Sequence, residues 1–245
     1  MIRIENTITP SSEQWRTIIS SMRNPMNSWE KSDSYEAVDC NKCEKIEKEG
    51  ACYKEDRDCT GFECYEIGTN DLDLMTRLRG AGTDHRKFMR MITVYVDITA
   101  PLYWWKEFDT YKVGTVANSC STMHKIHAKE FTLEDFSYEH LGRSPLILMK
   151  NIIDELNACR HLYLDGGYDG YVDVPPKDKG VWWQMIQLLP SSYNQKRTVM
   201  LNYEVLRNMY HARKNHKLDE WSVGFVEWVK SLPYAELITD DDKEV

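Results

Sequence analysis

Residues 188–213 read LLPSSYNQKRTVMLNYEVLRNMYHAR, and this stretch decides which fold the chain can adopt. A Leu-Pro pair ends an apolar run, and the segment Lys196–Leu201 that follows reads as a β-strand. Asn202 comes directly after that strand, where its side chain predicts the cap of a helix that continues to about Arg213. A strand leading directly into a capped helix indicates a domain that mixes the two kinds of element.

The rest of the chain supplies further strands and helices in both directions from this stretch. Apolar and polar residues alternate at Ile2–Ile8 and Ile92–Ile98, which predicts two more strands. Ser11 and Gln14 have the spacing of a capping box, and Asn70 is placed to cap a helix that Gly80 ends. The predicted helices span 12–23, 70–80, 102–111, 144–163, 181–189, 202–213 and 218–232, whereas 24–66 looks irregular. The expected fold class is α/β in the α+β sense, a mixed sheet with flanking helices.

Composition excludes two kinds of partner. The formal net charge of -8 argues against a nucleic-acid polymer, because phosphate backbones require a basic surface. The chain has no apolar run of the length that a membrane span needs, so we expect no membrane partner. Its first residues lack the apolar core of a secretory signal, which favours a cytoplasmic protein.

Cysteines concentrate in one polar and acidic part of the chain. Five of the seven fall within 25 residues, at Cys40, Cys43, Cys52, Cys59 and Cys64. The favoured interpretation is a set of reduced thiols in a surface insertion at about 30–66. A zinc-bearing interaction module is the alternative, because the first pair has Cys-x-x-Cys spacing. Disulfides would require an oxidising compartment. Because reduced thiols are the favoured interpretation, no metal site is assigned.

The opening stretch also carries a resemblance to a known family. Leu189, Pro190, Asn202 and Arg213 occur at the intervals found in the flavin-dependent thymidylate synthase family, ThyX. The stretch GAGTDHRKFMRMITVYVDITAPLYWWKEF, residues 80–108, is similar to a second part of that family. The resemblance covers residues 1–23 and 68–232, and it implies a single ThyX-like domain, 1–245, that assembles as a homotetramer.

The family signature is only partly present. Asn118 and Ser121 match the Asn and the second Ser of Arg-His-Arg-x-x-Ser-x-Asn-Glu-x-Ser-x-Arg-Tyr, whereas the Arg-His-Arg is absent. Met123 and His124 stand at the signature's final Arg and Tyr, and Glu204 stands where the family has an arginine. Because a guanidinium binds phosphate bidentately, we expect an acidic side chain there to repel a nucleotide phosphate.

The resemblance nevertheless implies a set of binding residues. FAD would contact His85, Asn118, Ser121 and Asn202, and a nucleotide-like substrate would contact Gln184, Ser191, Ser192 and Arg213. No catalytic residue is assigned. The pairs Trp104–Trp105 and Trp182–Trp183 are expected in the core or at an interface, with stacking on a ring ligand as the alternative.

Two functions follow from the resemblance. The first is reductive methylation of a pyrimidine deoxynucleotide such as dUMP, with methylenetetrahydrofolate as the carbon donor and reduced FAD as the hydride donor. The second is non-catalytic nucleotide binding on the same fold, after loss of flavin chemistry. The missing arginines favour the second function, and the broad coverage of the fold favours the first.

Overall fold

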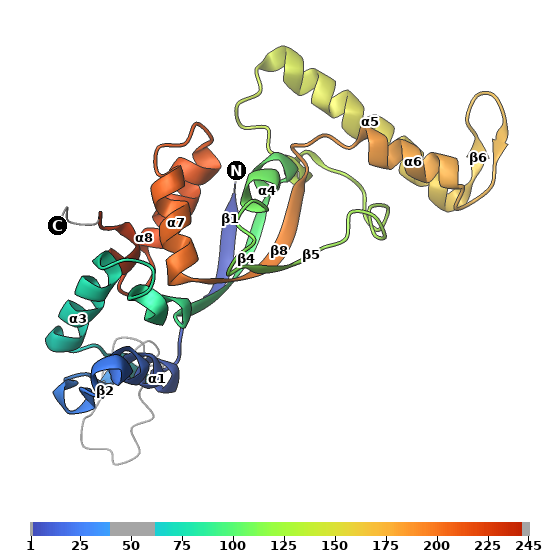
Figure 1. Cartoon of the computed structure of the whole chain (residues 1–245). Helices are drawn as coiled ribbons and strands as arrows, with labels where there is room; N and C mark the ends of the chain where they lie inside the picture. Colours follow the sequence, from blue (N-terminus) through green and yellow to red (C-terminus); the bar gives the residue numbers. More distant parts are fainter. Residues whose placement is uncertain (1, 40–61, 242–245) are drawn as a thin grey trace, which may run out of the picture. The chain divides into compact units, whose positions relative to one another are not determined.

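The computed structural model describes residues 2–39 and 62–241 and shows a mixed α/β architecture (Figure 1). Its larger sheet has the strand order β1-β4-β8-β5. These strands are β1 (Arg3–Ile8), β4 (Thr93–Pro101), β5 (Val116–Ser119) and β8 (Asn194–Asn202). The helices are α1 (Ser12–Arg23), α3 (Thr69–Gly80), α4 (Leu102–Phe108), α5 (Arg143–Asp165), α6 (Lys179–Leu188), α7 (Tyr203–Arg213), α8 (Val226–Lys230) and α9 (Glu236–Thr239). The predicted α/β class, with helices flanking a sheet, is confirmed.

The chain divides into two compact units, each assembled from three stretches of sequence. The first unit comprises Met1–Thr7, Val96–Val199 and Arg213–Trp228. The second unit comprises Ile8–Tyr95, Met200–Ala212 and Val229–Val245. Within the described part of the chain, no helix combines the length and the apolar run that crossing a bilayer requires.

Helix α1 of the second unit forms as its sequence predicts. The Ser11 hydroxyl accepts from the Gln14 amide at 3.3 Å, and the Gln14 side chain accepts from the Ser11 amide at 2.8 Å. This reciprocal capping box satisfies two backbone donors that an uncapped helix would leave unpaired. The buried face of the helix carries Trp15, Ile18, Ile19 and Met22.

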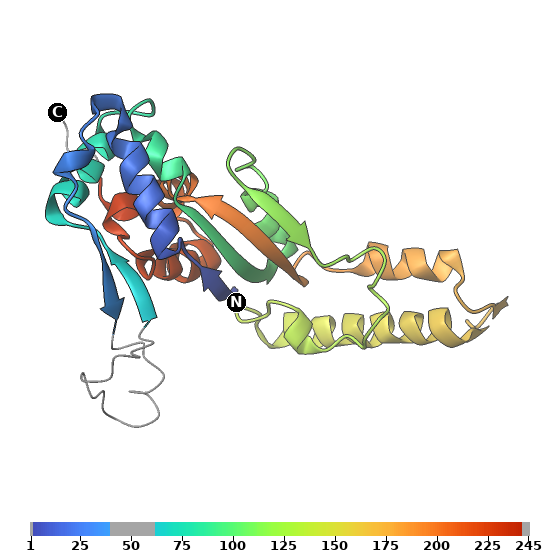
Figure 2. The same ribbon diagram turned by 90° about the horizontal axis from the view of Figure 1, so that it is seen from below.

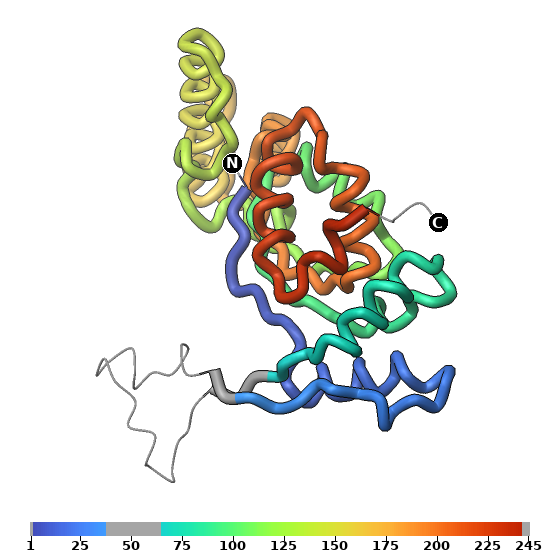
Figure 3. The backbone as a smooth tube through the Cα atoms, turned by 90° about the vertical axis from the view of Figure 1, so that its left-hand side faces the viewer, coloured from blue at the N-terminus to red at the C-terminus, as the bar shows by residue number. Residues whose placement is uncertain are grey.

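Helix α3 shows a different cap from the predicted one. The helix begins at Thr69, so Asn70 lies inside it and the prediction of an Asn70 cap is wrong. Asp33 caps the helix instead, because its carboxylate accepts from the amides of Asn70 at 2.9 Å and Asp71 at 3.1 Å. Figure 3 traces α1 and α3 in neighbouring positions, and a buried ion pair between Arg23 and Asp71 joins them.

The segment predicted to be irregular contains regular structure at both ends. Strands β2 (Tyr35–Asp39) and β3 (Phe62–Glu66) pair in an antiparallel hairpin whose register places Asp39 opposite Phe62. The irregular assignment of 24–66 is therefore wrong for these strands, and the pairing was missed because it is not local in sequence. The cysteines at 40, 43, 52 and 59 lie outside the described residues, as does the hypothesis of a zinc site there.

An aromatic cluster forms part of the core of the first unit. Trp104 stacks on Trp221 with 4.4 Å between ring centroids, and both rings are fully buried. The core placement predicted for Trp104–Trp105 is therefore confirmed.

The predicted single helix over 218–232 is wrong, because a π-helical segment, Glu220–Phe225, precedes α8. Such segments widen a helix locally and are frequent at functional sites.

A helical hairpin makes up much of the remainder of the first unit. Helices α5 and α6 lie side by side, joined by the short strands β6 (Gly167–Tyr168) and β7 (Asp173–Val174), as Figures 1 and 2 show. Met149, Ile153 and Leu156 of α5 pack in one cluster with Val181 and Met185 of α6. The apolar stripe predicted for α5 is thus confirmed, with Ile152 and Tyr163 half-buried at its margin.

Candidate functional site

Arg213, the arginine that the opening stretch singled out, lies at the end of α7 and is held by side chains of its own unit. Its guanidinium donates to the Glu107 carboxylate at 2.8 Å and to the Tyr111 hydroxyl at 2.9 Å. The same group lies over the Trp221 ring, 5.2 Å from the centroid, and is only 19% exposed. His216 approaches the same Glu107 carboxylate at 3.2 Å. A ligand phosphate would compete with the Glu107 carboxylate for the charge of this arginine.

Glu204 is the second residue of α7 and is neutralised inside the second unit. Arg90 donates to both of its carboxylate oxygens, one of them at 3.2 Å, and Arg86 lies 3.8 Å away. The hydrogen bond and charge of Glu204 raise the pKa of Arg90. Two guanidinium groups therefore offset the repulsion that Glu204 was expected to exert on a phosphate. The Glu204 carboxylate is itself the anion that these two groups bind.

Asn202 and His85 are the other two predicted residues of the second unit. The Asn202 side chain accepts from the Val205 amide at 3.0 Å, so the predicted helix cap is confirmed. His85 directly precedes the 3-10 helix η4 (Arg86–Arg90), and its side chain is exposed. An exposed imidazole and a capping amide present donors and acceptors to solvent, but the structure assigns neither of them a ligand.

Ser191 and Ser192 lie in the turn between α6 and β8. Their carbonyls accept from the amides of Tyr103 at 3.1 Å and Ser137 at 2.9 Å, which fixes the backbone of the turn. The Ser192 hydroxyl is buried and has no hydrogen-bond partner among the described residues. Because buried hydroxyls are normally paired, this group is available to a polar ligand or a water molecule.

Gln184 lies apart from these serines, on α6. The Gln184 side-chain oxygen is 3.5 Å from the Cys159 thiol of α5. Gln184 also lines a pocket of about 530 Å³ that extends to Asp169 and Tyr171 of the β6–β7 hairpin. Burial raises the pKa of the Cys159 thiol, which keeps it protonated and unreactive.

Asn118 and Ser121 lie at the exposed C-terminal end of β5. Asn118 lies within the strand, and the Ser121 hydroxyl accepts from the His124 amide at 2.9 Å. Between them, the Cys120 amide donates to the Lys196 carbonyl at 2.9 Å, which continues the pairing with β8. The structure thus gives this run a strand end and a turn, and none of the other seven predicted residues lines the pocket of Gln184.

One buried polar pair was missed by sequence reasoning. The Tyr103 hydroxyl donates to the carboxylate of Glu220, which is 7% exposed and belongs to the π-helical segment. Burial and the neighbouring carboxylate raise the pKa of Tyr103, so the phenol stays protonated. No local pattern announces this pair, because its members are 117 positions apart in the chain.

Comparison with solved structures identifies the class of fold. The chain is similar to thymidylate synthase X (ThyX) from Helicobacter pylori solved with FAD and dUMP, at 14% identity and a TM-score of 0.56, over 96% of this chain and 94% of that one. A second structure, the flavin-dependent thymidylate synthase ThyX of Helicobacter pylori complexed with FAD and dUMP, gives 13% identity and a TM-score of 0.57, over 96% and 95%. No protein-family profile and no curated protein sequence matches the chain. The likeness establishes a ThyX-like fold.

Proposed function

We propose that this protein is a divergent relative of the flavin-dependent thymidylate synthases that binds a pyrimidine deoxynucleotide and FAD. The observation that carries the proposal is the fold likeness, which extends from end to end of this chain and of two ThyX chains solved with FAD and dUMP. The corresponding activity is reductive methylation of a dUMP-like nucleotide with methylenetetrahydrofolate as the carbon donor. When bound, the flavin would supply the hydride.

The residues proposed to bind these ligands are those that the resemblance implies. His85, Asn118, Ser121 and Asn202 are proposed for FAD, and Gln184, Ser191, Ser192 and Arg213 for the nucleotide. Asn202 supports its assignment, because it caps the start of α7, where backbone amides attract an anion. The assignment of Ser192 is supported by its buried hydroxyl, which forms no hydrogen bond with any described residue.

The phosphate-binding side chains fit these ligands poorly in the arrangement observed. Arg213 is paired with Glu107, and Arg90 is paired with Glu204. A phosphate at either arginine would compete with an existing charge-assisted hydrogen bond. We therefore assign no catalytic step to these residues.

The same two ion pairs support a second candidate function, non-catalytic nucleotide binding on the ThyX-like fold. Glu204 pairs with Arg90 and Arg86, so these guanidinium groups are less available to a flavin phosphate. A mononucleotide requires only one local anion site. The two functions differ in catalysis and in binding of the flavin, and flavin binding is the simpler of the two to measure.

A homotetramer and a cytoplasmic location belong to the same proposal. Exposed apolar side chains on the α5–α6 hairpin fit self-association: Ile147 is 53% exposed, Leu148 61% and Trp183 44%. Burial of such side chains against a second subunit would remove their apolar surface from water.

The deciding experiment is the visible absorbance spectrum of the purified protein, with and without added FAD. Bands near about 375 and 450 nm, the usual positions for an oxidised flavin, support the flavoprotein and lead to an assay of deoxynucleotide methylation. Absence of bands in excess FAD rejects the flavoenzyme, and retained binding of dUMP by calorimetry would then support the non-catalytic function. An Arg213→Lys variant tests whether the proposed nucleotide site uses the guanidinium fork.

A further inference from the structure

A groove of about 460 Å³ lies between β1 and the segment that leads into α8, within the first unit. It is lined by Ile2, Ile4, Asp219, Val223, Gly224, Glu227 and Trp228. None of the eight residues proposed above for FAD or the nucleotide lines this groove.

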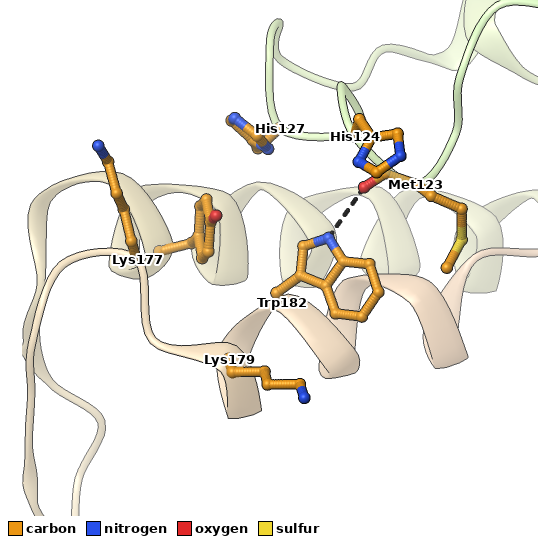
Figure 4. Close-up of a pocket in the computed structure, with 7 residues that line it drawn as sticks. Met123, His124, His127, Lys177, Lys179 and Trp182 are labelled. Carbon is orange, nitrogen blue, oxygen red and sulfur yellow. Dashed lines mark hydrogen bonds between the residues drawn. The ribbon is translucent and has the colours of Figure 1, made fainter.

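The groove against β1 is distinct from the pocket that Figure 4 shows. In that pocket the Trp182 indole donates to the Met123 carbonyl at 3.0 Å, beside His124. Met123 and His124 occupy positions of the ThyX signature, so that pocket belongs with the function proposed above. The two cavities have no lining residue in common.

β1 is an edge strand whose outer side is open. The order β1-β4-β8-β5 places β4 on one side of it, and within residues 2–39 and 62–241 no strand pairs with its other side (Figure 1). Every residue of the strand except Ile4 is exposed. An open edge presents backbone donors and acceptors with which an extended segment of another chain can pair.

The groove beside this edge has apolar walls that are held in place. Ile2 and Ile4 are two positions apart, so their side chains lie on the same face of the extended chain. Ile2 packs on the backbone at Gly224, where an added Cβ atom would lie 2.3 Å from Ile2 Cγ2. The Trp228 indole donates to the Thr7 hydroxyl at 3.0 Å, which joins α8 to β1. The walls are therefore formed before any ligand binds.

The charged residues of the groove are both acidic. Asp219 and Glu227 contribute carboxylates, and no lining residue is a lysine or an arginine. The Asp219 carboxylate lies 3.2 Å from the His140 imidazole, whereas Glu227 is exposed and forms no ion pair within the described part of the chain. A ligand that combines apolar side chains with positive charge is complementary to this surface.

We propose that β1 and this groove bind an extended basic peptide segment of a partner protein. The segment adds to the open edge of β1 as a further strand, through backbone hydrogen bonds. Because side chains alternate between the faces of a strand, every second residue of the segment lies on the same face as Ile2 and Ile4. Apolar residues of that series cover Val223, which is 48% exposed, and a lysine or arginine of the same series reaches Glu227. This docking does not depend on flavin or nucleotide binding.

Fluorescence polarisation with the labelled peptide Lys-Thr-Val-Thr-Val-Thr-Lys tests this inference, because its lysines and valines share one face. We expect saturable binding to the unmodified protein. The same peptide with N-methylated backbone amides keeps its side chains but loses its backbone donors. It should bind about tenfold or more weakly, since several hydrogen bonds to β1 disappear.

Two variants locate the bound peptide, each with a matched control. Glu227→Gln should weaken binding about threefold to tenfold, whereas Glu155→Gln, which makes the same change of net charge on α5 outside the groove, should not. Val223→Lys places a like charge in the groove and should abolish binding. Val113→Lys, at a 90% exposed valine of the same unit outside the groove, should bind as the unmodified protein does.

Three outcomes would overturn the inference. The first is an unmodified protein that does not bind the peptide. If Val223→Lys then changes the oligomeric state in light scattering, the groove holds a second copy of this chain instead. The second is equal binding of the N-methylated peptide, which would exclude strand addition. The third is equal weakening in Glu227→Gln and Glu155→Gln, which would show attraction to net charge alone.

Discussion

Asp71 shows what a single residue contributes to the second unit. Its carboxylate is fully buried and accepts from Arg23 at 2.6 Å, from Ser32 at 2.7 Å and from Ser34 at 2.6 Å. Replacing it in Asp71→Asn leaves the Arg23 guanidinium buried without a counter-charge. We expect the free energy of unfolding in urea to fall by about 3–5 kcal/mol. Asp73→Asn, at an exposed carboxylate on the same helix, should change it by less than about 1 kcal/mol.

The same carboxylate gives that prediction a pH dependence. Burial by itself would raise the pKa of Asp71, but hydrogen bonds from Ser34, Ser32 and Arg23 outweigh burial and lower it. A lowered folded-state pKa gives stability that is present above the unfolded value of about 3.9 and is lost as the pH falls through the folded value. The unmodified protein should therefore lose more stability than Asp71→Asn between neutral pH and about pH 3. Equal losses in the two proteins would contradict this account.

Glu204 stands where the ThyX family has an arginine, and Arg90 and Arg86 neutralise its charge. Glu204→Gln removes the charge that Arg90 and Arg86 now neutralise, and both guanidinium groups become available to a phosphate. We expect FAD or dUMP to bind about threefold to tenfold more tightly, as measured by titration. Glu30→Gln, at an exposed position of the same unit, is the control. Unchanged affinity in Glu204→Gln would show that no ligand phosphate reaches these arginines.

At the scale of elements, the sequence predicted best where the signal is local. The capping box of α1 and the Asn202 cap of α7 are encoded within four residues, and both form as expected. The cap of α3 was assigned wrongly because the carboxylate that accepts from its first amides belongs to Asp33, which is far from the helix in sequence. The same limit applies to the site. The pairing of Arg213 with Glu107 spans 106 positions, so no window of sequence reveals that this arginine is occupied.

Gly166 controls how the α5–α6 hairpin turns back on itself. Its φ is +71°, and a Cβ atom built there would lie 2.8 Å from Pro176 Cδ and 2.8 Å from the Val174 carbonyl oxygen. Gly166→Ala therefore combines a strained backbone with a steric clash. We expect a loss of about 1–3 kcal/mol in the free energy of unfolding, measured by urea denaturation. Gly170→Ala, where a Cβ atom meets nothing within 4 Å, isolates the backbone strain from the clash.

At the scale of the whole molecule, the testable property is self-association. Leu148 of α5 is 61% exposed, and Leu148→Glu places a charge on the surface proposed for subunit contact. Because a buried unpaired charge is costly at an interface, we expect the variant to shift toward monomer in size-exclusion chromatography with light scattering. Asn151→Glu introduces the same carboxylate at another exposed position of α5 and is the control. A monomeric unmodified protein would rule out the proposed tetramer.

The β2–β3 hairpin has a consequence for how this protein can evolve. Asp39 and Phe62 occupy the last paired position, so the two ends of the sequence between them lie on adjacent strands. The entropic cost of closing a loop rises only slowly with its length. The length and composition of the sequence between these two positions can therefore change at little cost to the pairing of β2 with β3. A lineage that inherits this pair of strands can gain or lose chemistry between them while selection on the rest of the fold continues separately.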